Sequence, residues 1–219
     1  MSRIAVFGES FDPVHLGHLS IIKSIDRYIQ PDQILVIPCG NPPHRSTSLT
    51  AVHHRLQMLE LACESMGQVS ARVEIDDREV QSNDLSYTYT SISTIAEENP
   101  QAELFMAVGW DSLANFTAWH RWRDILSLAS VLVVDRNKAS FTLPQDLGVL
   151  VRSIEAIKAD SQSDCFLDLT DNLIIELPFD EIAVSSTQVR SAIAHDEALE
   201  EMLPPPVIEY IAENTLYRS

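Results

Sequence analysis

Short apolar runs alternate along this chain with longer amphipathic segments, and that alternation constrains the fold more than any other feature. The runs at residues 4–7, 34–37, 72–75, 103–108, 131–134 and 173–177 have the length and composition of buried strands. Helical periodicity lies between them, at residues 17–28, 51–66, 89–98 and 121–126. Strands that alternate with helices indicate βαβ units and a parallel sheet. We therefore expect an α/β fold with a doubly wound, Rossmann-like parallel sheet, which binds ligands beyond the carboxyl ends of its strands.

The C-terminal region contains two further predicted helix starts. Hydroxyl side chains at residues 185–187 precede a helical segment at 188–194, and three prolines at 204–206 precede one at 207–214. Residues 137–163 have little pattern, which predicts a loop-rich excursion with one helix. We predict one domain over residues 1–219, with an α/β core at 1–180 and a small helical subregion at 181–219.

Charge and hydropathy limit the classes of partner. The chain has 219 residues and a formal net charge of −17, because 32 acidic residues face 15 Lys and Arg. Such a field repels nucleic acid and anionic membranes, although a local pocket can still bind a small anion. The apolar runs are too short to cross a bilayer, and Cys39, Cys63 and Cys165 form no disulfide framework. We expect a cytoplasmic protein that binds small molecules; whether it forms a homo-oligomer stays open.

The most informative motif lies between the first predicted strand and the first predicted helix. Residues 7–18 read Phe-Gly-Glu-Ser-Phe-Asp-Pro-Val-His-Leu-Gly-His, which is neither a dinucleotide fingerprint nor a P-loop. His15 and His18 stand at a helix N-terminus, where free N–H groups and the helix dipole favour phosphate. Gly17 between them leaves room for a flat base. The alternatives are a buried histidine pair in the core, or a zinc site for which only Glu9 and Asp12 offer further ligands.

These residues resemble a known family. Gly-x-Ser-Phe-Asp-Pro-x-His-x-Gly-His at 8–18 resembles the signature of the nucleotidylyltransferases, and Ser-Ser-Thr-x-x-Arg at 185–190 resembles their second element. Together with the segments at 41–45, 86–88, 109–112, 118–122 and 216–218, the chain resembles bacterial nicotinate-nucleotide adenylyltransferases over nearly its whole length. It departs from that pattern at Glu9, where the family usually has a second glycine, and at residues 84–85, where a glycine is missing.

The resemblance implies transfer of the adenylyl group of ATP to nicotinate mononucleotide, with Mg²⁺ accompanying ATP and no metal held by the protein alone. It implies catalytic roles for His15, His18 and Arg190. The residues implied to bind ATP are Gly8, Ser10, Phe11, Gly17, Gly109, Asp111, Ser185, Ser186 and Thr187. The residues implied to bind the acceptor are Asn41, His44, Arg45, Thr88, Trp119 and His120.

Other interpretations of the same residues remain open at this point. The 185–190 segment alone is a helix cap with an exposed arginine, Trp119 and Trp122 are packing residues, and Arg45 and Arg55 belong to a solvated face. A sister transferase acting on phosphopantetheine, nicotinamide mononucleotide or a cytidylyl acceptor shares the first motif. A non-catalytic nucleotide-binding paralogue is a further alternative, for which Glu9 is the only indication.

Overall fold

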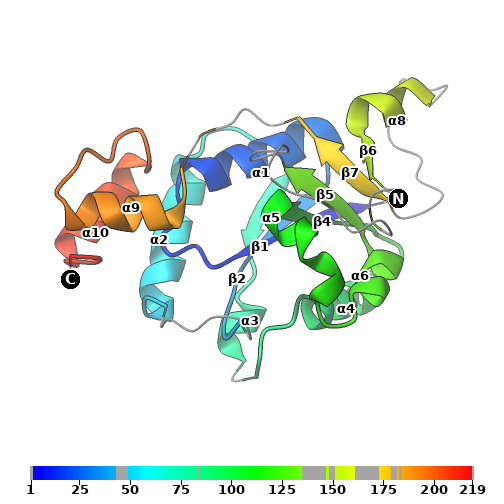
Figure 1. The fold of residues 1–219 in the computed structure, drawn as a ribbon, viewed down its shortest axis with the longest axis horizontal. Helices are drawn as coiled ribbons and strands as arrows, with labels where there is room; N and C mark the ends of the chain where they lie inside the picture. Colours follow the sequence, from blue (N-terminus) through cyan, green and yellow to red (C-terminus); the bar gives the residue numbers. More distant parts are fainter. Residues whose placement is uncertain are drawn as a thin grey trace.

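The computed structural model describes residues 2–42, 49–82, 84–134, 147, 151–160, 173–178, 182 and 184–218. Its centre is a parallel sheet with the strand order β3-β2-β1-β4-β5-β7-β6, covered by helices (Figure 1). The predicted α/β fold with a Rossmann-like parallel sheet is confirmed.

The strands follow the predicted runs closely. They are β1 (Arg3–Glu9), β2 (Gln33–Pro38), β3 (Arg72–Ile75), β4 (Glu103–Gly109), β5 (Ser130–Val134), β6 (Val151–Ser153) and β7 (Ile174–Leu177). Only β6 was not predicted, and it lies within residues 137–163, where the sequence predicted loops and one helix. This three-residue strand pairs only with β7 at the sheet edge and is partly exposed, so its sequence shows no apolar run.

The main helices also lie where periodicity or helix-start residues indicated them, and α8 is the one helix expected within residues 137–163. They are α1 (Leu16–Ile29), α2 (Val52–Ser65), α4 (Thr88–Glu98), α6 (Trp122–Leu128), α8 (Ile154–Asp160), α9 (Ser186–Ala194) and α10 (Pro205–Glu213). Shorter helices that the sequence did not indicate are α3 (Arg78–Gln81), α5 (Trp110–Ala114) and the 3₁₀ turn η1 (Phe116–Ala118). Each of these has five residues or fewer, too short to show periodicity.

Side-chain alternation along β1 builds a separate core on each face of the sheet. Ala5 and Phe7 face one cluster together with α1, α2, α9 and α10, whereas Ile4 and Val6 face another with α4 and α6. This period of two is what a strand buried on both faces requires.

The order of the strands reverses between β1 and β4. The chain steps outward from β1 to β2 and β3, then returns to pair β4 with the other side of β1. Because the strands are parallel, the ends at Glu9, Pro38 and Gly109 meet at one edge. In doubly wound sheets, ligands bind at such a reversal.

The C-terminal helices α9 and α10 lie beside α2 at one end of the molecule (Figure 1). His54 of α2 and the Tyr210 hydroxyl of α10 share a hydrogen bond of 2.9 Å. The N–H of Leu16, at the start of α1, donates to the carbonyl of Met202 over 2.9 Å. These contacts bring the last helices against the beginning of α1.

Candidate active site

The turn between β1 and α1 places two imidazoles at the reversal point of the sheet. His15 is the N-cap of α1 and His18 lies in its first turn, with 1% and 4% of their surfaces exposed. Their rings stack with centroids 3.6 Å apart, and the ring of Phe11 lies 5.0 Å from that of His18. Such burial is equally typical of core histidines. Their position at the carboxyl end of β1, on a helix N-terminus, is what favours an anion site.

The hydrogen bonding of His18 determines which of its nitrogens can donate. The backbone N–H of His15 donates to Nδ1 of His18 over 3.1 Å. Nδ1 is therefore an acceptor, and in the neutral ring the proton is on Nε2. Nε2 is thus the ring nitrogen of His18 that carries the donor proton.

Close packing around the turn explains why Gly17 separates the two histidines. A Cβ at Gly17 would lie 3.0 Å from Nδ1 of His15 and 3.3 Å from Cγ1 of Val184. Both contacts are tighter than ordinary packing. A side chain at this position would therefore push against the imidazole or against the segment that leads into α9.

Three carbonyls of the turn accept hydrogen bonds from distant side chains. Arg55 of α2 donates to the carbonyl of Ser10 over 2.8 Å, and it is 1% exposed, so the interpretation of Arg55 as part of a solvated face is wrong. Arg190 donates to the carbonyl of Asp12 over 2.6 Å, and Ser186 donates to that of Pro13 over 3.0 Å. The two sequence motifs, about 175 residues apart, are therefore in direct contact.

Part of Arg190 remains exposed to solvent beside the β1–α1 turn. A second guanidinium nitrogen donates to Oγ1 of Thr187 over 3.2 Å, and the residue is half-buried. Ser185 is the N-cap of α9, as the helix-cap interpretation expected, and its hydroxyl accepts from the N–H of Gln188 over 3.2 Å. The cap interpretation and the phosphate interpretation are therefore compatible.

A cavity of about 820 Å³ opens at the same edge of the sheet. It lies between the ends of β1, β2 and β4 and the starts of α4 and α5. Six of the residues named from the sequence line it: Gly8, Ser10, Thr88, Asp111, Trp119 and His120. This volume is in the range of small-molecule sites.

The aromatic wall of the cavity comes from the segment after α5. The ring of Trp119 lies 5.1 Å from that of Phe116, which fixes one of its edges in the core, while the residue also lines the cavity. His120 lies 4.7 Å from the ring of Tyr87. Trp122 also packs on Phe116, at 6.2 Å, but does not line the cavity. The packing interpretation thus describes Trp122, whereas Trp119 packs on Phe116 and also lines the cavity.

Two further predicted residues, Gly109 and Asn41, lie close to cavity residues. Gly109 is the N-cap of α5, and a Cβ there would lie 2.5 Å from Oδ1 of Asp111. Asn41 is exposed, and its N–H donates to Oγ of the cavity residue Ser86 over 2.9 Å. His44 and Arg45 lie outside the described residues.

The described lining of the cavity is electronegative. Glu9, Glu79 and Asp111 contribute carboxylates, and no Lys or Arg occurs among the lining residues that the structure describes. His120 is the one lining side chain in this set that can become cationic. Within the described part of the chain, no group of three or more His, Cys, Asp or Glu is arranged to hold a metal ion.

Sequence reasoning missed Glu79 and the turn-holding role of Arg55. Glu79 lies in the short helix α3, and its Oε1 accepts from Oγ of Ser91 over 2.6 Å inside the cavity. A Cβ at Gly40 would clash with the backbone carbonyl of Glu79, so glycine is required for α3 to pack here. No sequence pattern marks these contacts of Glu79, because they depend on α3 packing against the segment after β2. The Arg55 contact depends on α2 packing against the β1–α1 turn.

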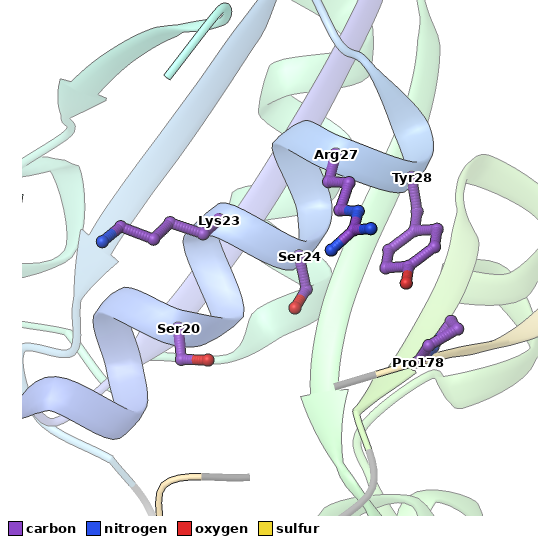
Figure 2. Close-up of a pocket in the computed structure, with 6 residues that line it drawn as sticks. All are labelled: Ser20, Lys23, Ser24, Arg27, Tyr28 and Pro178. Carbon is purple, nitrogen blue, oxygen red and sulfur yellow. The ribbon is translucent and has the colours of Figure 1, made fainter. Parts of the chain in front are cut away.

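A second, smaller hollow of about 230 Å³ lies along α1, away from this edge of the sheet. Figure 2 shows Ser24, Arg27 and Tyr28 on the side of α1 nearest Pro178, whereas Lys23 extends the other way. The two cations therefore do not converge on one point, and this hollow takes no part in the candidate site.

Comparison with known proteins gives a consistent family. Residues 6–192 match the cytidylyltransferase-like family. The chain is 31% identical to a probable nicotinate-nucleotide adenylyltransferase of Pseudomonas entomophila over 220 residues, which is 99% of this chain and 95% of the relative. A probable nicotinate-nucleotide adenylyltransferase of Dechloromonas aromatica is also 31% identical, with 99% and 98% covered.

Solved structures share the fold. Nicotinic acid mononucleotide adenylyltransferase of Plasmodium falciparum, complexed with NaAD, superposes with a TM-score of 0.75 at 19% identity and covers 99% of this chain and 98% of its own. A putative nicotinate-nucleotide adenylyltransferase of Vibrio parahaemolyticus gives 0.67 at 21% identity, with 100% and 97% covered. No helix in the described part of this chain is long and apolar enough to span a membrane.

Proposed function

The chain belongs to the cytidylyltransferase-like family, among the nicotinate-nucleotide adenylyltransferases, and from that premise we propose that it transfers the adenylyl group of ATP to nicotinate mononucleotide. The products are nicotinate adenine dinucleotide and pyrophosphate. The observation that carries the proposal is the meeting of the two motifs at one turn, beside a cavity with an aromatic wall.

The reaction needs alignment and charge neutralisation more than proton transfer. The acceptor is a phosphate monoester with a second pKa of about 6, so it is already a dianion at neutral pH. One of its oxygens bonds to the α-phosphorus, the bond from that phosphorus to the β-bridging oxygen breaks, and pyrophosphate leaves with the electron pair. His15, His18 and Arg190 donate to the phosphate oxygens on which charge accumulates.

The remaining ATP contacts follow from the position of the turn. Ser10 and Gly8 lie at the cavity mouth beside the turn, and the N-terminal N–H groups of α9 lie where its hydroxyl residues meet Pro13. Residues 1–219 would therefore work as one unit, because the C-terminal subregion completes a site that begins in the core.

The acceptor's pyridine ring would lie against Trp119. Thr88 at the start of α4 offers a backbone N–H, and His120 offers a ring donor, for the carboxylate. Since the described lining contains three carboxylates and no Lys or Arg, selectivity for an acid depends on these uncharged donors and on His120.

Mg²⁺ would enter with ATP. Glu9 and Asp111 line the cavity, and both are exposed enough for their oxygens to meet a hydrated cation. When bound, Mg²⁺ supplies charge neutralisation at the phosphates. Glu9, which replaces the family's usual glycine, would then have a cation to face rather than bare phosphate.

The test is a pyrophosphate-release assay with ATP and three acceptors: nicotinate mononucleotide, nicotinamide mononucleotide and phosphopantetheine. We expect kcat/KM for the acid to exceed that for the amide about tenfold to a hundredfold, because an amide leaves a donor unpaired at about 1–3 kcal/mol. Equal values would refute the acid as the substrate, and no release with any acceptor would refute the transfer activity.

A matched pair of tryptophan variants tests the acceptor pocket. Trp119→Ala is expected to raise KM for the mononucleotide about twofold to tenfold through lost stacking, with KM for ATP unchanged. Trp122→Ala, which also loses a contact with Phe116 but does not line the cavity, should leave both KM values near those of the parent. Equal effects of the two variants would contradict the placement of the ring.

A further inference from the structure

We propose that Tyr217, two residues before the last residue of the chain, is a positioning residue for the adenylyl transfer and acts through the carboxylate of Asp12. The inference rests on the proposed function. It concerns a contact between the last turn of the chain and the β1–α1 turn, which holds His15 and His18.

Asp12 joins the two ends of the chain. The Tyr217 hydroxyl donates to Oδ1 of Asp12 over 2.8 Å, across 205 positions of sequence. Oδ2 of Asp12 accepts from the N–H of Thr50 over 3.3 Å. Asp12 is 5% exposed, so these bonds replace water that a carboxylate would otherwise bind.

The backbone of Asp12 is also held by a hydrogen bond. Its carbonyl accepts from Arg190, while the neighbouring carbonyls of Ser10 and Pro13 accept from Arg55 and Ser186. The backbone of the turn is thus fixed from α2 and α9, whereas the side chain of Asp12 is fixed by the tail and by Thr50. Loss of the tail contact releases one specific restraint three residues before His15.

The conformation of the tail indicates that this contact is maintained. Thr215 and Tyr217 have φ angles of 53° and 62°, in the left-handed region that non-glycine residues rarely adopt. Such conformations cost free energy and persist only where surrounding contacts compensate. Burial raises the pKa of Tyr217, so its hydroxyl stays protonated and able to donate throughout the neutral range.

The chain provides a matched control in Tyr210. Its hydroxyl makes a hydrogen bond of 2.9 Å with His54, from the same C-terminal subregion, without touching the turn. Tyr217→Phe and Tyr210→Phe each remove one hydroxyl and keep the ring. A purely structural role predicts similar consequences for both.

The experiment measures kcat, both KM values and hydrogen exchange of residues 9–18 in the parent, Y217F and Y210F. We expect Y217F to lower kcat about tenfold, the equivalent of one hydrogen bond, with KM for the acceptor unchanged. Exchange at 9–18 should accelerate in Y217F alone. Equal kcat in Y217F and parent, or equal losses in both variants, would overturn the inference.

A double-mutant cycle with Asp12→Asn tests whether Tyr217 acts through that carboxylate. If it does, kcat of the double variant should be no lower than kcat of the less active single variant. If the fold-loss of kcat in the double variant equals the product of the two single losses, Tyr217 does not act through Asp12, and the proposed route is overturned. A parent with no transfer activity refutes the proposed function instead, and hydrogen exchange at 9–18 still decides whether the tail restrains the turn.

Discussion

At the scale of single residues, several buried polar groups of the site have specific hydrogen-bond partners. His18 illustrates this, because the N–H of His15 occupies its Nδ1 and leaves Nε2 as the donor. Arg55 is a buried polar residue whose burial was not predicted from the sequence. Its guanidinium is almost completely buried and donates to two carbonyls, at Ser10 and Thr50, whereas the sequence interpretation placed it on a solvated face.

The first residue-scale prediction concerns His18→Ala. Loss of one donor to the charge that develops on phosphate should lower kcat about a hundredfold, an effect of roughly 3 kcal/mol. His53→Ala is the control, because it removes an exposed imidazole from α2 and should leave kcat near that of the parent. Circular dichroism at the assay temperature verifies that both variants are folded. Equal kcat in His18→Ala and parent would remove this ring from the mechanism.

At the scale of elements, the start of α9 serves both the fold and the site. Ser185 and Gln188 form a reciprocal capping box, in which the Ser185 N–H donates to Oε1 of Gln188 over 2.8 Å and the hydroxyl accepts from the Gln188 N–H. Ser186, the first helical residue, reaches the turn at Pro13. The orientation of α9 therefore positions Arg190 one helical turn later.

Ser185→Ala should destabilise the protein by about 0.5–2 kcal/mol, the usual range for loss of an N-cap side chain. Ser191→Ala removes an exposed hydroxyl from the same helix and should change stability by less than about 0.5 kcal/mol. Urea denaturation of the three proteins measures both values. Indistinguishable midpoints for the two variants would show that the capping box contributes nothing to stability.

At the scale of the whole molecule, burial of weak acids makes the free energy of unfolding depend on pH in the alkaline range. Burial, with a smaller contribution from Glu64, raises the pKa of the Cys63 thiol from about 9 to about 11. Between these values the folded chain retains a proton that the unfolded chain releases. This contribution to stability is therefore complete below pH 9 and is lost as pH rises towards 11.

We expect the parent Tm to fall between pH 9 and 11, and Cys63→Ala to fall less steeply over the same range. Cys39→Ala is the control, because it removes a second half-buried thiol, which lies just after β2 and far from Cys63 in the sequence. Differential scanning calorimetry at four pH values gives the slopes. Parallel curves for parent and Cys63→Ala would contradict the assignment of this pH dependence to the buried thiol.

The sequence by itself determined the parallel sheet, most helix positions, the β1–α1 turn with His15 and His18, and the cap of α9. Each of these is local, because strand runs, helical periodicity and capping patterns depend on residues within a few positions of one another. The sequence also indicated Thr88, Trp119 and His120 as a group through their likeness to a family, and they do line one cavity.

The tertiary structure alone decided which distant side chains donate hydrogen bonds to the β1–α1 turn and which acidic side chains line the cavity. Arg55, Arg190 and Tyr217 reach the β1–α1 turn from three separate parts of the chain, and Glu79 enters the cavity because α3 packs against Gly40. No periodicity records such pairings, because the requirement that a buried carbonyl or carboxylate find a donor does not specify where in the sequence the donor lies.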